Sequence, residues 1–146
     1  HLEPHAEYLG IDRDPGAIRA ARINAERAGD ITWRAGDAGS IRSWPGYVDR
    51  VITNPPWNVR VSLGDFSLQA DAWWHALRPG GLAVAIVNGD QAEVLLRSER
   101  WHVREVRDLS VAGQHPRIVV VTPNKGHGRR SSRRWRPDAF SPPGGP

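Results

Sequence analysis

Two consecutive prolines, Pro55 and Pro56, constrain the fold of this chain more than any other feature of its sequence. They lie in the tetrapeptide Asn54-Pro55-Pro56-Trp57, directly after the apolar segment 48–53, which is typical of a buried strand. Proline has no backbone N–H and fixes φ, so the chain can neither continue a sheet ladder nor begin an ordinary helical turn here. The strand must therefore end in a stiff, extended turn that carries a side-chain amide and an indole ring.

This turn allows two interpretations. It is either a rigid corner between a strand and a helix, with a structural Trp, or part of a ligand site. The second interpretation is attractive because ligands of open α/β sheets bind at the carboxyl ends of the strands. However, proline-rich turns are common and short motifs match by chance, so the tetrapeptide alone leaves both interpretations open.

Short apolar segments alternate with helical patterns along the chain. Strands are expected at residues 8–12, 31–34, 48–53, 82–87, 103–109 and 117–122, and helices at 15–28, 40–43, 66–77 and 90–96. Asp14 and Asp90 are expected as helix N-caps. Residues 78–81 contain Pro and Gly and are expected to end the preceding helix, before the next strand begins. The alternation predicts an α/β fold with a doubly wound, mostly parallel sheet. The short polar link 110–116 predicts that the last strand is antiparallel.

The composition excludes several kinds of site. The chain contains no Cys, which rules out disulfides, thiolate catalysis and Cys-based zinc sites, and no metal site is expected. No apolar segment approaches the ~20 residues that a membrane span needs, and no signal peptide is recognisable. We therefore expect a cytoplasmic protein without a membrane partner.

The charge distribution divides the chain into two parts. Residues 124–146 carry six basic and one acidic side chain, which leaves 14 basic and 15 acidic side chains in residues 1–123. We expect one folded domain over residues 1–123. The segment 124–146 is rich in Gly, Pro, Ser and Arg, and such a composition cannot bury enough apolar surface to fold, so a disordered basic tail is expected there.

Five short signatures follow one another along the chain. They are Gly10-Ile11-Asp12-Arg13-Asp14-Pro15, Ala21-Arg22-Ile23-Asn24-Ala25 with Ala28-Gly29, Gly36-Asp37-Ala38, Asn54-Pro55-Pro56-Trp57 and Leu77-Arg78-Pro79-Gly80-Gly81. In this order they resemble the class I S-adenosylmethionine-dependent methyltransferases, and most closely the THUMP-associated guanosine-N2 RNA methyltransferases. The resemblance covers residues 8–121. It implies a Rossmann-like sheet, S-adenosylmethionine as the cofactor, and tRNA or rRNA as the partner.

The resemblance assigns Asp12, Arg13, Asp37 and Ala38 to the cofactor. A carboxylate at a strand end, such as that of Asp12, can accept hydrogen bonds from two vicinal ribose hydroxyls. Asp37 matches the residue that holds the adenine amino group, and the backbone of Ala38 matches the contact to a ring nitrogen. The alternative roles are helix capping for Asp12 and turn formation for Asp37.

The resemblance assigns Asn54, Pro55, Pro56 and Trp57 to catalysis. The side-chain oxygen of Asn54 and the backbone carbonyl of Pro55 each accept one hydrogen of an exocyclic amine, which directs its lone pair at the methyl group. Pro56 stiffens the turn, and Trp57 stacks on the flipped base, an interaction worth ~1–3 kcal/mol per base. Catalysis is then mainly orientation, which can supply ~7–11 kcal/mol.

The substrate stays open at this point, and one element of the family is missing. Adenine-N6 methylation of DNA or RNA and methylation of a protein glutamine use the same kind of turn, and a non-catalytic remnant is a further alternative. Trp57 is followed by Asn58, whereas the family usually has Phe or Tyr followed by Gly.

No Gly-rich loop precedes Tyr8. We therefore expect an N-terminally truncated domain whose sheet lacks its first, central strand between the strands that end near Asp12 and Asn54. A chain of this kind is expected to be inactive by itself.

Overall fold

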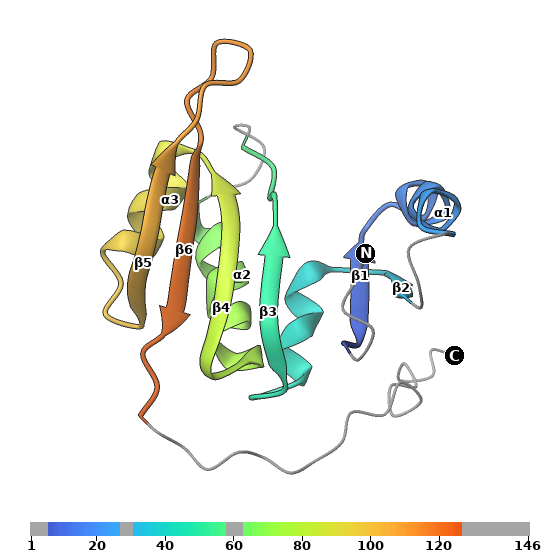
Figure 1. Cartoon of the computed structure of the whole chain (residues 1–146), viewed down its shortest axis with the longest axis horizontal. Coiled ribbons are helices and arrows are strands. Elements are labelled where there is room, and N and C mark those ends of the chain that lie inside the picture. Colours follow the sequence, from blue (N-terminus) through green and yellow to red (C-terminus); the bar gives the residue numbers. More distant parts are fainter. Residues whose placement is uncertain (1–5, 27–30, 58–62, 127–146) are drawn as a thin grey trace.

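Strands and helices alternate along the computed structural model, which describes residues 6–26, 31–57 and 63–126 (Figure 1). The elements are β1 (Tyr8–Asp12), α1 (Pro15–Asn24), β2 (Ile31–Ala35), the 3₁₀ helix η1 (Ala38–Ser43), β3 (Val48–Thr53), α2 (Leu63–Ala76), β4 (Leu77–Val87), α3 (Gly89–Leu96), β5 (Trp101–Asp108) and β6 (Arg117–Pro123). Each strand expected from the sequence is present, and the α/β alternation is confirmed. No helix among the described residues has the length and apolar character that a membrane crossing requires.

The described strands form two sheets. β1 pairs parallel with β2, and the other four strands form a sheet of order β3-β4-β6-β5. β3 is parallel to β4, whereas β6 is antiparallel to both β4 and β5, so the prediction of an antiparallel last strand is confirmed. The larger sheet is therefore mixed rather than mostly parallel. Strand β6 lies between β4 and β5 and is antiparallel to both, so only the β3–β4 pair of this sheet is parallel. Among the described strands, none joins β1 to β3 (Figure 1).

The main hydrophobic core lies between the four-stranded sheet and the helices α2 and α3, which cover one of its faces (Figure 1). Side chains of a strand alternate between the two faces of its sheet. Ala83 and Ala85 of β4 therefore face the helices together with their partners Val121 and Val119 of β6, and all four are buried. From α2, the ring of Phe66 is fully buried.

Strand β4 begins earlier than the sequence predicts. Helix α2 ends at Ala76, just before residues 78–81, as predicted. The prediction that the strand starts only after these residues is wrong, because β4 starts at Leu77 and continues through them. Leu77 pairs with Val48 and Leu82 pairs with Arg50, so the intervening residues form a bulge. Gly80 permits this bulge with a φ of +77°. Proline and glycine thus end the helix here without ending the strand pairing.

The ends of three helices also differ from expectation. Helix α1 ends at Asn24, and residues 27–30, which include the end of the predicted helix, lie outside the described residues. Helix α2 begins at Leu63 rather than at Phe66. Helix α3 is capped by Asn88 and not by Asp90, because Asn88 forms a reciprocal capping box with the residue three positions later.

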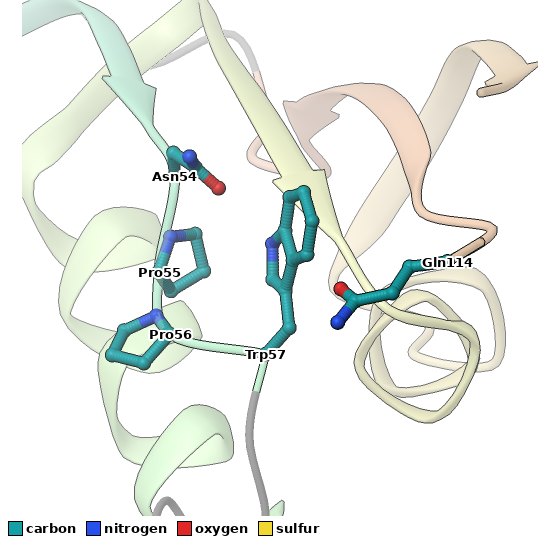
Figure 2. A pocket seen from close by; sticks show the side chains of 5 residues that line it. All are labelled: Asn54, Pro55, Pro56, Trp57 and Gln114. Carbon is teal, nitrogen blue, oxygen red and sulfur yellow. The ribbon is translucent and has the colours of Figure 1, made fainter. Parts of the chain in front are cut away.

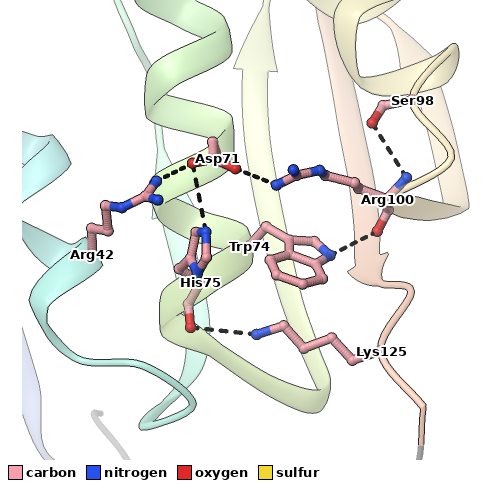
Figure 3. Close-up of polar contacts among 7 residues, drawn as sticks. All are labelled: Arg42, Asp71, Trp74, His75, Ser98, Arg100 and Lys125. Atoms are coloured by element: carbon pink, nitrogen blue, oxygen red, sulfur yellow. Dashed lines mark hydrogen bonds and ion pairs between the residues drawn. The ribbon is translucent and has the colours of Figure 1, made fainter.

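Asp71 of α2 connects three parts of the chain. Its carboxylate forms ion pairs with Arg42 of η1 and with Arg100, which precedes β5, and lies 3.7 Å from Nε2 of His75 (Figure 3). The indole N–H of Trp74 donates to the carbonyl of Arg100 at 3.1 Å, and the guanidinium of Arg100 lies over the Trp74 ring. Asp71 therefore ties η1 and the α3–β5 connection to α2.

Lys125 binds backbone carbonyls at the carboxyl end of helix α2. Its ammonium group donates to the carbonyls of Leu77 and His75 at 2.6 and 3.3 Å, and it lies 4.5 Å from the centre of the Trp74 ring (Figure 3). Burial lowers the pKa of Lys125. Contacts with the domain thus continue two residues into the segment predicted as a tail, and residues 127–146 lie outside the described part of the chain.

Replacing Phe66 by Ala is expected to lower the free energy of unfolding by about 3–5 kcal/mol, because the ring is fully buried and contacts Trp73 edge-on. Leu68 provides a matched control on the same helix, since its side chain is 70% exposed. Leu68→Ala should change the free energy by less than about 0.5 kcal/mol. Urea unfolding measures both values, and equal losses would contradict this description of the core.

Asp71→Asn is expected to destabilise the protein in a pH-dependent way. Burial alone would raise the pKa of Asp71, but the hydrogen bond and charge of Arg42, with the charges of His75 and Arg100, lower it below the ordinary 3.8. Such a carboxylate stabilises the fold above about pH 4, and its contribution is lost as the pH falls through the folded-state pKa.

At pH 7 the expected loss is about 1 kcal/mol, a modest value because both arginines are half exposed. Urea unfolding should show that this loss shrinks toward pH 3. Glu99→Gln is the control, since Glu99 is exposed and forms no ion pair within the described ranges. A loss that is the same at both pH values would contradict the assignment.

Candidate functional site

The Asn-Pro-Pro-Trp turn (residues 54–57) lies at the carboxyl end of β3, where the sequence places it. Val51 of β3 is part of the main core, which holds the strand in place. Asn54 is exposed, Pro55 is buried and Trp57 is half-buried. The amide of Asn54 and the indole of Trp57 point toward one another across the turn (Figure 2).

Two cavities adjoin this turn. One, of about 330 Å³, is lined by the four residues of the turn and by Gln114, which belongs to the link between β5 and β6 (Figure 2). The other, of about 290 Å³, shares Trp57 and Gln114 with the first. Its remaining lining residues are Asn88, Gly89, His115 and Pro116. The turn therefore opens onto space that extends to the β5–β6 link.

The β5–β6 link has its own local structure. Val111 and Gln114 exchange two backbone hydrogen bonds of 3.0 and 2.9 Å, and Ala112 and Gly113 between them have φ values of 48° and 78°. This geometry is a two-residue turn, and it determines the position of the Gln114 backbone. Sequence analysis did not predict Gln114 as a lining residue, because its position depends on a strand pairing that brings distant segments together.

The ring of Trp57 is held by strand β4. Its indole N–H donates to the carbonyl of Ile86 at 2.9 Å. This hydrogen bond fixes the orientation of the ring before any ligand arrives. Trp57 thus presents a rigid aromatic surface to the cavity.

Two side chains from the start of α3 hold the backbone of the turn. Nδ2 of Asn88 donates to the carbonyl of Trp57, and Nε2 of Gln91 donates to the carbonyl of Pro56, both at 3.0 Å. Gln91 is only 2% exposed. Sequence analysis missed both residues, although an Asn followed three positions later by a Gln is a capping-box pattern that could have drawn attention to them.

The two acceptors nearest to β3 are left open. Among the described residues, none donates a hydrogen bond to the side-chain oxygen of Asn54 or to the carbonyl of Pro55. Both groups belong to the turn that lines the cavity of about 330 Å³. They are the two acceptors that the sequence predicted for an amine.

The residues predicted to bind the cofactor lie together at the carboxyl ends of β1 and β2. The guanidinium of Arg13 forms an ion pair with Asp37, including an Nε to Oδ2 contact of 2.9 Å. Asp37 also accepts a hydrogen bond of 2.7 Å from the backbone of Gly39 and caps η1, of which Ala38 is the first residue. The turn-forming role of Asp37 is therefore present in the structure, and a contact with adenine stays a prediction.

Charge and hydrogen bonding shift the pKa values of this pair. The hydrogen bond from Arg13, then that from the Gly39 backbone, lowers the pKa of Asp37. The same interaction raises the pKa of Arg13. Both side chains thus remain charged at neutral pH.

Asp12 has one carboxylate oxygen available for a ligand. Its Oδ1 accepts a hydrogen bond of 2.8 Å from the backbone of Asp14, and Oδ2 has no partner within the described residues. Asp14, not Asp12, is the N-cap of α1, so the alternative role of Asp12 as the cap is not what the structure shows.

The predicted cofactor residues and the Asn-Pro-Pro-Trp turn form separate groups. None of Asp12, Arg13, Asp37 and Ala38 lines either cavity at the turn. Within the described ranges, no three His, Asp or Glu side chains gather in a way that would hold a metal ion.

Known proteins with similar sequences are methyltransferases. Residues 1–117 match the family described as "RMKL-like, methyltransferase domain". Ribosomal RNA large subunit methyltransferase K/L of Vibrio campbellii is 40% identical over 60 residues, which are 38% of this chain and 8% of that protein. Ribosomal RNA large subunit methyltransferase G of Stutzerimonas stutzeri is 40% identical over 68 residues, which are 43% of this chain and 17% of that protein. The chain thus matches less than a fifth of the length of these relatives.

A solved structure has the same fold. TrmN from Thermus thermophilus superposes with a TM-score of 0.72 at 22% identity, over 84% of this chain and 38% of that one. The α/β methyltransferase fold is therefore confirmed. Because the family match covers well over half of the sequence, the chain belongs to the RMKL-like methyltransferase domains, a family of S-adenosylmethionine-dependent methyltransferases.

Proposed function

We propose that this chain is part of an RNA methyltransferase that transfers the methyl group of S-adenosylmethionine to N2 of guanosine in rRNA or tRNA. The observation that carries the proposal is the pair of open acceptors, the side-chain oxygen of Asn54 and the carbonyl of Pro55, beside the fixed ring of Trp57. Two relatives that are named ribosomal RNA methyltransferases support the choice of RNA.

Two acceptors at the end of one strand suit an amino group that carries two hydrogens. The lone pair of an exocyclic amine is delocalised into the base, so the free amine is a poor nucleophile. Acceptance of one hydrogen by Asn54 and the other by Pro55 would draw the nitrogen toward tetrahedral geometry, so that its lone pair is less delocalised and points at the methyl group. Orientation of this kind can supply ~7–11 kcal/mol, and it requires no metal ion and no covalent intermediate.

The indole of Trp57 provides a surface for the target base. Its ring orientation is set by the hydrogen bond to Ile86, so little order has to be gained on binding. Stacking of a base on an aromatic ring is worth ~1–3 kcal/mol. A base turned out of an RNA strand into the cavity at the turn would then place its amino group near Asn54.

The strand ends of β1 and β2 would hold the cofactor. S-adenosylmethionine supplies an electrophilic methyl group when bound. The exposed Oδ2 of Asp12 fits a ribose hydroxyl, and the Arg13–Asp37 pair holds the ends of the two strands together. Ala38, the first residue of η1, offers a backbone N–H at the same place.

The proposal includes a further strand between β1 and β3 that carries the Gly-rich loop of the cofactor site. Among the described strands, β1 pairs only with β2, and β3 pairs only with β4, so each has an unpaired edge. Ile52 in β3 is 81% exposed, which an additional element would cover. The activity is therefore proposed for a domain in which this strand is present.

In the protein that contains the further strand, Asn54→Ala is expected to lower kcat about 100-fold or more and to leave the affinity for S-adenosylmethionine unchanged. Asp12→Ala should instead weaken cofactor binding. Transfer of a labelled methyl group to RNA measures kcat, and calorimetry measures affinity. Asn24→Ala, at the exposed end of α1, is the matched control. Intact turnover in Asn54→Ala would show that the proposed mechanism is wrong.

The modified nucleoside identifies the substrate directly. Mass spectrometry of nucleosides from RNA treated with the active protein should show N2-methylguanosine. The same two acceptors also suit the N6 amino group of adenine and the side-chain amide of glutamine. N6-methyladenosine, or methylation of protein without any change in RNA, would therefore replace the guanosine assignment and keep the role of Asn54.

A further inference from the structure

We propose that Asn88 and Gln91 are positioning residues for methyl transfer, because each uses its amide oxygen to cap α3 and its amide nitrogen to hold the Asn-Pro-Pro-Trp turn. The inference rests on the proposed function of that turn. Neither residue touches the reacting atoms in this account. They act through the backbone carbonyls of Pro56 and Trp57.

The turn needs hydrogen-bond donors from elsewhere in the chain. Pro55 and Pro56 have no backbone N–H, so the turn cannot satisfy its own carbonyls as an ordinary turn does. A partly buried carbonyl without a donor costs about 1–3 kcal/mol. The carbonyls of Pro56 and Trp57 obtain their donors from Gln91 and Asn88, and both bonds are partly buried.

In each of these two amides the oxygen accepts one hydrogen bond and the nitrogen donates another. Oδ1 of Asn88 accepts from the backbone N–H of Gln91 at 2.8 Å, and Oε1 of Gln91 accepts from the backbone N–H of Asn88 at 3.1 Å. Their nitrogens are the donors to the turn at 3.0 Å. If either amide were flipped, its nitrogen would face a backbone N–H and its oxygen would face a backbone carbonyl. The hydrogen bonds therefore allow only one orientation of each amide.

Helix capping alone does not require amides at these positions. Asp caps a helix as well as Asn does, and Glu serves as the third residue of a capping box as well as Gln does. Only the amides add donors that reach the turn. The residue types at positions 88 and 91 are thus explained by the turn rather than by the helix.

The hydrogen bonds from Asn88 and Gln91 also determine which acceptors of the turn remain available to a substrate. The carbonyls of Pro56 and Trp57 are occupied, and the side-chain oxygen of Asn54 and the carbonyl of Pro55 are open in the described part of the chain. Strand β4 ends at Val87, directly before Asn88, and its Ile86 carbonyl holds the Trp57 ring. The β4–α3 junction therefore fixes both the ring and the backbone on which the open acceptors depend.

Isosteric acids separate the two roles. Asn88→Asp keeps the oxygen that caps α3 and removes the donor to Trp57, so a capping role alone would leave activity unchanged. Because the Trp57 carbonyl loses its donor, we expect a modest loss of urea stability. The affinity for S-adenosylmethionine should be unchanged, whereas kcat should fall about 10- to 100-fold, because small displacements of reacting groups have effects of this size. The indole N–H of Trp57 should exchange with solvent faster, as NMR measures, with its signal assigned from Trp57→Phe.

Gln91→Glu provides a second, independent variant. A buried carboxyl has a raised pKa, and its protonated form can donate to the carbonyl of Pro56. The kcat of Gln91→Glu relative to the parent protein should therefore recover as the pH is lowered. A purely structural defect would show no such recovery.

Asn124→Asp is the matched control. It also removes a hydrogen bond from an amide nitrogen to a backbone carbonyl, that of Glu99 at 3.1 Å, but it lies beyond β6 at the opposite end of the sheet. This variant should keep the kcat of the parent protein.

The possible outcomes separate this inference from the function on which it rests. If the parent protein is active and Asn88→Asp keeps its kcat, or loses no more of its kcat than Asn124→Asp does, the positioning role is overturned. If the parent protein methylates no RNA, the proposed function fails. The exchange of the Trp57 indole then still tests whether Asn88 holds the turn: faster exchange supports it, and unchanged exchange overturns it.

Discussion

The carbonyl groups of a turn with two prolines need donors that the turn itself cannot provide, and much of this site follows from how that need is met. The donors are the side-chain amides of Asn88, the N-cap of α3, and Gln91 in its first turn. A third bond runs the other way, from the Trp57 indole to the end of β4. The turn is thus bonded to the junction of β4 and α3 rather than only to the strand that precedes it.

This junction is connected to the main hydrophobic core. β4 lies between β3 and β6 in the larger sheet, and its buried side chains face α2 and α3. Gln91 and Leu95 are both buried, so α3 cannot shift without disturbing the core. Local packing therefore determines where the open acceptors at Asn54 and Pro55 lie. The other half of the proposed site, around Asp12, depends instead on exposed contacts such as the Arg13–Asp37 pair.

Local features of the sequence predicted much of the fold. The prolines after the apolar run at 48–53 located the turn correctly, because proline acts through its own backbone. The prediction failed where distant segments decide the outcome. Residues 78–81 contain Pro and Gly and yet belong to β4, because pairing of Leu77 with Val48 continues the strand. Asn88, Gln91 and Gln114 were not predicted as site residues for the same reason, since their roles depend on contacts across the fold.

If Asn54 recognises an amino group of the target base, an RNA that lacks only this group should lose the contact. Inosine differs from guanosine by the absence of the N2 amino group. Affinities of the active protein and of its Asn54→Ala variant would be measured for RNAs with guanosine or inosine at the target position. The parent protein should prefer guanosine, and Asn54→Ala should lose most of this preference. Equal discrimination by both proteins would contradict this role of Asn54.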